Sequence, residues 1–538
     1  RKINDRVGEG VALSNIGFVY DRQKQPQQAL KLYQEALVIH RAMGDRPSES
    51  VTLNNLGRLQ LASGNYPAAT ETFFKAIEVL ESLRPGLNDA SKVSIFETQS
   101  RTYGLLQKSL VAQNKHEAAL EIAERGRARA FVERLAQRIT DRAPGQQRVP
   151  DALSRPIQID EIKRVARDQK ATLVQYSIIE DQQLFIWIVK PTGEVSFRNV
   201  SLQGVGKSPL SLEELVATGR EAIGVRGFSF NESTVIAAQP ALSAAAQNQK
   251  LQQMHQLLIQ PIADLLPSDP TARVIFIPQR SLFMVPFAAL QDSKGKYLIE
   301  QHTILTAPSV QVLALTHQQR QQRGATQLSL KGNDVLLVGN PTMPSIRPNL
   351  VDQARVLSSL PGAEQEVKSI AELLGAEALI GNQATKATVV SRMIKARLIH
   401  LATHGLLEDF KRVGVPGAIA LAPSDRDDGM LNASEILDLP LIADLVVLSA
   451  CDTGRGRITG DGVIGLSRSL LTAGVPSVIV SLWKVPDAPT ATLMTEFYKN
   501  LLQKPDKAQA LRQAMLTTLQ QYPDPKSWAA FTLIGEAE

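Results

Sequence analysis

An internal repeat constrains the fold of this 538-residue chain more than any other feature of its sequence. Residues 13–40 align with residues 53–80 at an offset of 40, and a looser third copy spans residues 102–129. Each copy carries apolar residues at i, i+3, i+4 and i+7, which predicts two amphipathic helices. The matched positions include Asn15 and Asn55, Gly17 and Gly57, Ala29 and Ala69, and Ala36 and Ala76, with Ala119 in the third copy. One copy cannot bury its apolar face alone, so about three copies form the smallest stable stack.

The helix pairs of residues 1–140 resemble tetratricopeptide repeats. The usual period of those repeats is about 34 residues, so the larger offset predicts longer helices or loops. Such a stack has a concave surface, and we expect it to bind a protein or peptide partner. Two alternatives stay open: the repeats only support the rest of the chain, or they form a contact between two molecules of this protein. Because the first residue is Arg1 and not Met, we expect a partial or processed chain that further repeats can precede.

Composition excludes several classes of protein. Hydrophobic residues make up 43% and charged residues 21%, which is typical of a globular protein and not of a disordered one. The net charge of +6 comes without a run of basic residues, which argues against a nucleic-acid partner. No apolar stretch is long enough to span a membrane. The single cysteine, Cys451, excludes an internal disulfide and a multi-cysteine zinc site and fits the cytoplasm. We expect no metal and no cofactor.

The remaining chain predicts a mixed sheet. Residues 141–156 are rich in Pro, Arg and Gln and predict a linker. From Thr172 onward, alternating apolar and polar residues predict an antiparallel meander. Short apolar runs then predict buried parallel strands, with helices between most of them, at 274–278, 334–340, 397–403, 444–450 and 477–483. The fold class is therefore helical repeats followed by an α/β domain, a mostly parallel sheet with helices on both faces. Ligands of such sheets bind beyond the carboxyl ends of the strands.

Two of these strand ends carry reactive side chains. His404 and Gly405 follow one strand, and Cys451 follows the next parallel strand. A thiolate attacks a carbonyl, and a nearby imidazole takes up the thiol proton. The amides of Gly405 and Cys451 are candidates for an oxyanion hole. Each side chain alone is more simply a packed core residue, but their joint position favours a catalytic dyad. His400 lies inside its strand, so we expect it to pack or to support the site from behind.

Other catalytic motifs are absent or incomplete. The chain has no G-x-S-x-G elbow, and residues 204–208 lack the first glycine of a phosphate-binding loop. Residues 460–465 match G-x-G-x-x-G but begin too far beyond their strand for a dinucleotide site. We expect a mobile substrate loop there. Residues 425–429 lack the glycine and glutamate of a calcium loop, and a helix capped by Asn432 with Glu435 is the better interpretation.

Several ordered blocks resemble the CHAT domain, a caspase-like cysteine protease domain found beside tetratricopeptide repeats. They include ERGRARAF, IPQRSLFMVPFAAL, YLIEQHTILTAPS, HLATHG, DGMLNASEILDL, LSACDTG, GDGVIGLSRSLLTAGVPSVIVSLWKVPD and WAAFTLIG. The resemblance implies a caspase-like fold in which His404 and Cys451 match the family's dyad. It also implies a support or pseudo-protease half at 157–330, as in separase-like enzymes, and a catalytic half at 331–538.

The same resemblance implies a substrate pocket for the residue before the cleaved bond (P1). Separase has a similar block with an acid that holds a P1 arginine, and Asp487 stands at the matching place, with Asp461 and Trp483 as further candidates. A carboxylate pairs well with a guanidinium. The equal alternative is that Asp487 caps the helix after it, and Lys484 departs from the separase pattern, which has an acid there.

The sequence thus predicts a cytoplasmic cysteine endopeptidase that cleaves a protein substrate after Arg or Lys. An activator on the repeats would reposition residues 405–417 and 452–462. By family analogy alone, its setting is bacterial defence. The first alternative is a catalytically silent repeat scaffold with a degenerate protease fold. The second, a nucleotide-handling protein, is disfavoured by the incomplete phosphate loop.

Overall fold

The computed structural model describes residues 5–83, 89–141, 155–202, 211–225, 243–322, 330–346, 353–406, 417–450, 457–459 and 462–538. At residues 89–99, 141, 457–459 and 462–464 it describes the backbone alone. Most of the predicted linker lies outside these ranges, as do residues 204–208, Cys451 and Asp461. Within them, no helix has the length and apolar character needed to cross a membrane.

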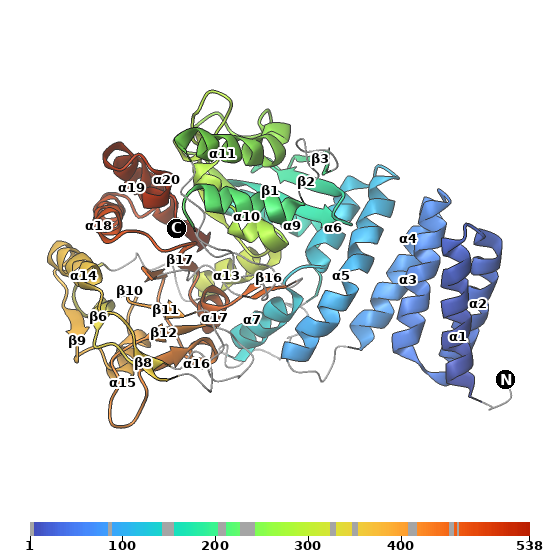
Figure 1. The fold of residues 1–538 in the computed structure, drawn as a ribbon, viewed down its shortest axis with the longest axis horizontal. Coiled ribbons are helices and arrows are strands. Elements are labelled where there is room, and N and C mark those ends of the chain that lie inside the picture. Colours follow the sequence, from blue (N-terminus) through green and yellow to red (C-terminus); the bar gives the residue numbers. More distant parts are fainter. Residues whose placement is uncertain are drawn as a thin grey trace.

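The first part of the chain is a stack of helix pairs (Figure 1). Its helices are α1 (Arg6–Arg22), α2 (Pro26–Met43), α3 (Arg46–Ala62), α4 (Tyr66–Ser82), α5 (Asp89–Val111) and α6 (His116–Arg125). The first four are 17 or 18 residues long, and these lengths with short turns account for the 40-residue offset. Polar caps start three of them: Asp5 accepts a hydrogen bond from the Gly8 amide, Asp45 from the Ser48 amide, and Asn65 from the Ala68 amide.

The matched small residues lie where the helices approach one another. Ala29, Ala36, Ala69 and Ala76 are fully buried. A Cβ atom on Gly57 would lie 2.7 Å from the Phe73 ring, so a side chain there would force the two helices apart. The repeated positions of the sequence are therefore the packing contacts of the stack.

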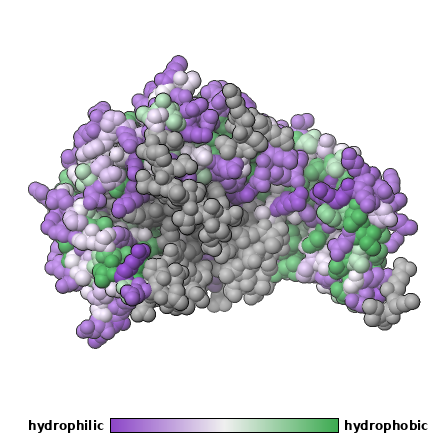
Figure 2. All heavy atoms as spheres, in the orientation of Figure 1, coloured by the Kyte–Doolittle hydropathy of each residue, from purple (hydrophilic) through white to green (hydrophobic). Residues whose placement is uncertain are grey.

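The first helix of the stack leaves an apolar face uncovered. Hydrophobic surface gathers over that end of the molecule in Figure 2. The exposed apolar side chains of α1 are Val7, Val11, Ile16, Phe18 and Val19.

A single sheet spans the rest of the chain. Its strands are β1 (Ala171–Ile179), β2 (Gln183–Val189), β3 (Val195–Ser201), β4 (Arg273–Ile277), β5 (Thr303–Thr306), β6 (Val335–Pro341), β9 (Ala378–Gly381), β10 (Leu398–Ala402), β14 (Leu445–Leu448), β17 (Ser477–Ser481) and β18 (Phe531–Gly535). Their order is β3-β2-β1-β4-β5-β18-β17-β14-β10-β6-β9. Strands β1 to β3 form the predicted antiparallel meander, and β18 is antiparallel to β17, whereas the other pairs are parallel.

Strand β18 joins the two parts of the sheet. It comes from the end of the chain, yet it lies between β17 and β5. The apolar pattern of the sequence predicted neither β18 nor its partner β5 as a strand. The sheet is therefore continuous across residues 157–330 and 331–538.

Helices cover both faces of the sheet. They are α7 (Arg129–Asp141), α9 (Ile159–Asp168), α10 (Leu212–Ala222), α11 (Ala244–Leu258), α12 (Leu298–Gln301), α13 (Val310–Gln322), α14 (Pro361–Leu374), α15 (Lys386–Met393), α16 (Ala433–Asp438), α17 (Leu466–Ala473), α18 (Asp487–Gln503), α19 (Lys507–Gln521) and α20 (Pro525–Trp528), with 3-10 turns at 260–262, 280–284, 287–289 and 332–334. Alternate residues of β6 belong to two separate apolar clusters, one with α14 and α18 and the other with α7 and α17. This period of two is what a sheet covered on both faces requires.

Short strands surround the carboxyl ends of the main sheet. One small sheet joins β11 (Gly405–Leu406), β12 (Ala418–Ala420) and β13 (Met430–Asn432). Two hairpins pair β15 (Arg457–Thr459) with β16 (Gly462–Ile464), and β7 (Ser345–Ile346) with β8 (Arg355–Val356). The predicted cap of α16 is present, since Glu435 accepts a hydrogen bond from the Asn432 amide at 2.8 Å.

Candidate active site

The carboxyl ends of β10 and β14 lie beside each other at one edge of the sheet. The two strands are parallel neighbours, and their register pairs Leu398 with Leu445 and Leu401 with Leu448. His404 lies two residues beyond the end of β10. After β14, the structure describes the chain as far as Ala450. Cys451 therefore lies outside the described residues, as does Asp461.

The His404 ring is half-buried and held in a defined orientation. Its Nε2 atom lies 2.8 Å from the carbonyl oxygen of Ser358. A carbonyl oxygen only accepts hydrogen bonds, so Nε2 carries the proton and donates it, and neutral His404 keeps its lone pair on Nδ1. The backbone on either side is also fixed, because the Ala420 amide donates to the His404 carbonyl at 3.0 Å and Gly405 pairs with Ile419.

Sequence reasoning missed Ser358. The interaction uses its backbone carbonyl, which every residue type has, so no side-chain pattern could indicate it.

A pocket of about 470 Å³ opens beside these strand ends. It is bounded by the residues that follow β10 and β14, the end of β17, the first turns of α14 and the segment before α18. Its lining consists of Leu360, Gly362, Ala363, Glu366, Thr403, Ser449, Ala450, Ser481, Trp483, Lys484, Val485, Asp487, Thr490 and Phe531. Thr403, the residue before His404, thus lines the pocket. Ser449 and Ala450, which precede Cys451 in the sequence, line it as well.

The structure brings two of the predicted pocket residues, Asp487 and Trp483, to this one cavity. Trp483 is buried, and its indole N–H donates to the Lys526 carbonyl at 3.0 Å. Asp487 is exposed, and its carboxylate forms no hydrogen bond or ion pair with the described residues. Pro486, not Asp487, occupies the cap position of α18, and no side chain there forms a capping hydrogen bond.

The first turn of α14 approaches Asp487 closely. A Cβ atom built on Gly362 would lie 2.3 Å from the Asp487 Oδ2 atom, so only glycine fits at this position without displacing the carboxylate. No sequence pattern indicated this contact, because it joins residues 125 positions apart on two different helices.

A buried polar network lies behind the pocket wall. His400 is fully buried in β10, as expected from its position inside the strand. Its Nδ1 atom lies 3.0 Å from the Tyr498 hydroxyl of α18, and its Nε2 atom lies 2.9 Å from Glu366 Oε1 of α14. Burial, with the nearby charge of Glu366, raises the pKa of Tyr498 well above 10. An ionised Glu366 only accepts, so His400 Nε2–H donates to it, and Nδ1 of neutral His400 then accepts from the Tyr498 hydroxyl.

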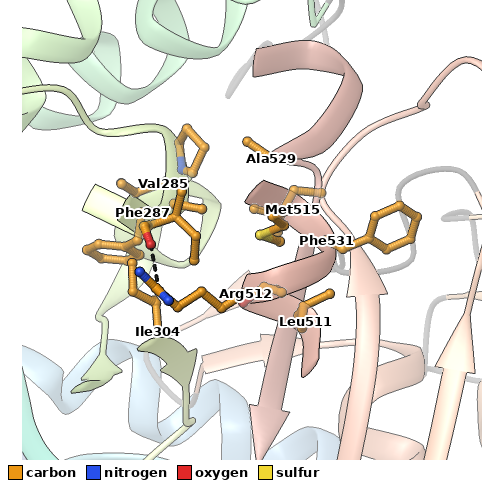
Figure 3. A pocket seen from close by; sticks show the side chains of 13 residues that line it. Val285, Phe287, Ile304, Leu511, Arg512, Met515, Ala529 and Phe531 are labelled. Atoms are coloured by element: carbon orange, nitrogen blue, oxygen red, sulfur yellow. Dashed lines mark hydrogen bonds between the residues drawn. The ribbon is translucent and has the colours of Figure 1, made fainter. Parts of the chain in front are cut away.

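A second cavity, of about 380 Å³, lies between the two parts of the sheet (Figure 3). Val285 and Phe287 approach it from one side, and Met515 and Phe531 from the other. Arg512 crosses it and donates to the carbonyls of Ile299 and Glu300, both at 2.9 Å. The lining is otherwise mostly apolar, so this cavity is a packing seam between the two parts of the sheet.

Comparisons with known proteins agree with this architecture. The CHAT domain model matches residues 248–536, and a tetratricopeptide repeat model matches residues 9–82. Human and mouse Tetratricopeptide repeat protein 28 are each 28% identical to the chain, over 91% and 92% of its length. The chain spans about a quarter of these relatives, 24% and 25% of their lengths.

Two crystal structures of the Saccharomyces cerevisiae separase–securin complex share the fold. They superpose with TM-scores of 0.57 and 0.53 at 12% and 11% sequence identity. The match covers 98% and 99% of this chain and 44% and 45% of the separase chains. Since the CHAT model alone covers more than half of the sequence, the chain belongs to the CHAT domain family, with its CHAT domain preceded by tetratricopeptide repeats.

Proposed function

We propose that this chain is a cysteine endopeptidase of the separase type, with Cys451 as the nucleophile and His404 as the general base. The observation that carries the proposal is the register of β10 and β14, which pairs residues 47 positions apart, such as Leu398 and Leu445. His404 and Cys451 are separated by the same 47 positions. A continuation of the register beyond the strands would bring them to the same level of the edge.

The orientation of His404 supports the role of a base. With its Nε2–H bound to the Ser358 carbonyl, the Nδ1 lone pair is left to accept the proton of a thiol. The Cys451 thiolate then attacks the scissile carbonyl, and the oxyanion is stabilised by the amides of Gly405 and Cys451. The imidazolium returns the proton to the leaving amine, and water hydrolyses the thioester with the same histidine as base. Ser358 stabilises the imidazolium by accepting its Nε2–H.

The pocket supports a basic P1 residue. Asp487 presents a carboxylate at its mouth that has no partner among the described residues, and Trp483 supplies an apolar wall. Lys484 also lines the pocket, and because it is exposed, solvent and salt screen the repulsion between its ammonium and a bound cation. Asp461 stays a prediction for the same pocket.

We also propose that a protein partner on the repeats controls the site through α7. This helix packs against α13 and α17, and Arg138 donates to the carbonyls of Leu437 and Leu439 at the end of α16. Helix α16 follows β13, whose small sheet includes Gly405, and α17 follows the β15–β16 hairpin. A shift of α7 would therefore reach both loops beside the dyad. The domain boundaries at 140, 156 and 330, the cytoplasmic setting and a role in bacterial defence stay predictions.

Alkylation kinetics test the dyad directly. The chain has one cysteine, so an iodoacetamide adduct in the intact mass reports Cys451 alone. We expect Cys451 to react at pH values well below its ordinary pKa of about 8.5, and His404→Asn to slow the reaction at that pH. Equal rates in parent and variant would contradict the base assignment.

Cleavage assays test the activity itself. The parent and Cys451→Ala proteins are incubated with a proteome-derived peptide library, and new termini are identified by mass spectrometry. Cleavage by the parent alone, after Arg or Lys, supports the proposal. Reactive Cys451 without any cleavage would favour control by a partner, and an unreactive Cys451 would favour the scaffold alternative.

A further inference from the structure

We propose that Glu366 is the buried acid that selects a cationic P1 side chain, deeper in the pocket than Asp487; this inference rests on the proposed protease function. Glu366 lies on the second turn of α14 and lines the pocket although only 3% of its surface is exposed. The two carboxylates therefore occupy two depths of one cavity, Asp487 at the mouth and Glu366 at the base.

Neutral His400 gives the buried carboxylate a hydrogen bond but no counter-charge. Its only polar contact with the described residues is the 2.9 Å hydrogen bond between Oε1 and His400 Nε2. No Lys or Arg in the described part of the chain forms an ion pair with it. A buried charge is costly unless it is paired. A cationic group that enters the pocket supplies the missing partner.

A second unsatisfied atom lines the same cavity. The Ser449 hydroxyl is buried and has no hydrogen-bond partner among the described residues. Buried polar atoms in native proteins are almost always bonded, so an orphan at a pocket wall indicates a ligand that is polar at that depth. A guanidinium carries five N–H donors in a planar fork, enough to bond Glu366, Asp487 and Ser449 together. A lysine ammonium has three donors and less reach, so we expect arginine to be preferred over lysine.

The network behind the wall holds the acid in position. Tyr498 donates to His400 and His400 donates to Glu366, so the chain of hydrogen bonds points toward Oε1 and leaves Oε2 for a ligand. The three residues come from α18, β10 and α14. His400 and Tyr498 are therefore positioning residues, and Glu366 touches the substrate.

Binding of a P1 mimic tests the inference without any cleavage. Agmatine carries the guanidinium of arginine but no scissile bond, and its urea analogue has the same shape and the same ammonium but a neutral urea in place of the guanidinium. We expect agmatine, and not the urea, to raise the melting temperature of the Cys451→Ala protein. Glu366→Gln in that background keeps the volume and an acceptor for His400 but removes the charge, and we expect agmatine affinity to fall about thirtyfold or more.

Matched variants separate a specific effect from a structural one. Glu372→Gln makes the same change on a residue of the same helix outside the pocket, and we expect affinity within about threefold of the parent. Glu366→Asp keeps the charge and should retain most of the preference of agmatine over its urea. If Glu366→Gln binds agmatine as the parent does while Asp487→Asn does not, Asp487 alone selects the cation and the inference is wrong.

Reporter peptides then connect the pocket to catalysis. With arginine or its neutral isostere citrulline at P1, Glu366→Gln should lower kcat/KM for arginine and leave citrulline nearly unchanged. Equal losses for both peptides would assign Glu366 a structural role and overturn the inference. Failure of every form to cleave, together with an unreactive Cys451 and with agmatine binding intact and dependent on Glu366, would reject the protease proposal and keep the cation site.

Discussion

The joint between the repeats and the sheet contains a buried ion pair whose removal has a calculable cost. Glu124 lies in α6, and its carboxylate accepts hydrogen bonds from the amides of Val310 (2.9 Å) and Gln311 (3.2 Å) at the start of α13. The Nε atom of Arg127 lies 3.7 Å from Oε1 of Glu124. The Arg127 side chain also donates to the carbonyl oxygens of Tyr176, within β1, and of Pro278, directly after β4. Both side chains are almost fully buried.

The substitution Arg127→Ala leaves the Glu124 carboxylate buried without a counter-charge. Breaking a buried pair from one side costs about 3–5 kcal/mol, a large share of the roughly 5–15 kcal/mol by which domains are typically stable. Burial already raises the pKa of Glu124, and loss of the arginine raises it further. Because a raised carboxyl pKa stabilises the folded state at low pH and destabilises it as pH rises through that pKa, the cost should be smaller at about pH 5 than at about pH 8.

Tryptophan fluorescence during urea unfolding measures this loss of stability in the sheet domain. The chain has three tryptophans, Trp187, Trp483 and Trp528, all buried in the sheet domain and none in the repeats. With an m value of about 3 kcal/mol per molar urea, the variant should lower the unfolding midpoint by about 1 M or more. The double variant Glu124→Gln/Arg127→Ala removes both charges and should recover about 1–3 kcal/mol of the loss.

Two results would refute this reasoning. The first is an Arg127→Ala protein whose unfolding free energy stays within about 0.5 kcal/mol of the parent, the range of a neutral surface substitution. The second is a cost that does not change between the lower and the higher pH, since the cost is assigned to the charge on Glu124.

Two further predictions concern packing and pH. Gly57→Ala should destabilise the repeats by about 1–3 kcal/mol, because its Cβ would lie 2.7 Å from Phe73; Gly104→Ala, whose Cβ would meet only Ile179 at 3.8 Å, should instead stabilise them by up to about 1 kcal/mol. Helicity during thermal unfolding compares the two, and equal effects would contradict the packing argument. Burial, helped by nearby cationic groups, lowers the pKa of His302 to about 4 from its ordinary 6.5. The folded state has the full contribution of this group above about pH 6.5 and loses about 3 kcal/mol of stability as pH falls toward about 4. His302→Gln should therefore flatten that part of the profile of unfolding free energy against pH, detected by tryptophan fluorescence. An unchanged slope would contradict the assignment.

Much of the fold could be predicted because its signals are local. The 40-residue offset placed Gly57 and Ala69 on facing helices, and the structure confirms both as packing positions. The five apolar runs correspond to β4, β6, β10, β14 and β17, because strands buried on both faces need continuous apolar residues. By contrast, β18 is a short segment at the end of the chain, and nothing in its own residues indicates that it lies between β17 and β5.

The candidate site likewise has residues that the sequence indicates and residues that it does not. A sequence indicates residues whose side chains are reactive by type, so His404 and Asp487 could be named from the sequence alone. It cannot indicate a backbone acceptor such as Ser358, nor an acid whose role depends on which strand its helix covers. Glu366 looks like any glutamate in the helix of residues 361–374, which also carries Glu364 and Glu372. Only packing of α14 against β10 distinguishes it, by burying it on His400 at the wall of the pocket. The proposed specificity therefore depends on tertiary contacts that residue type alone does not record.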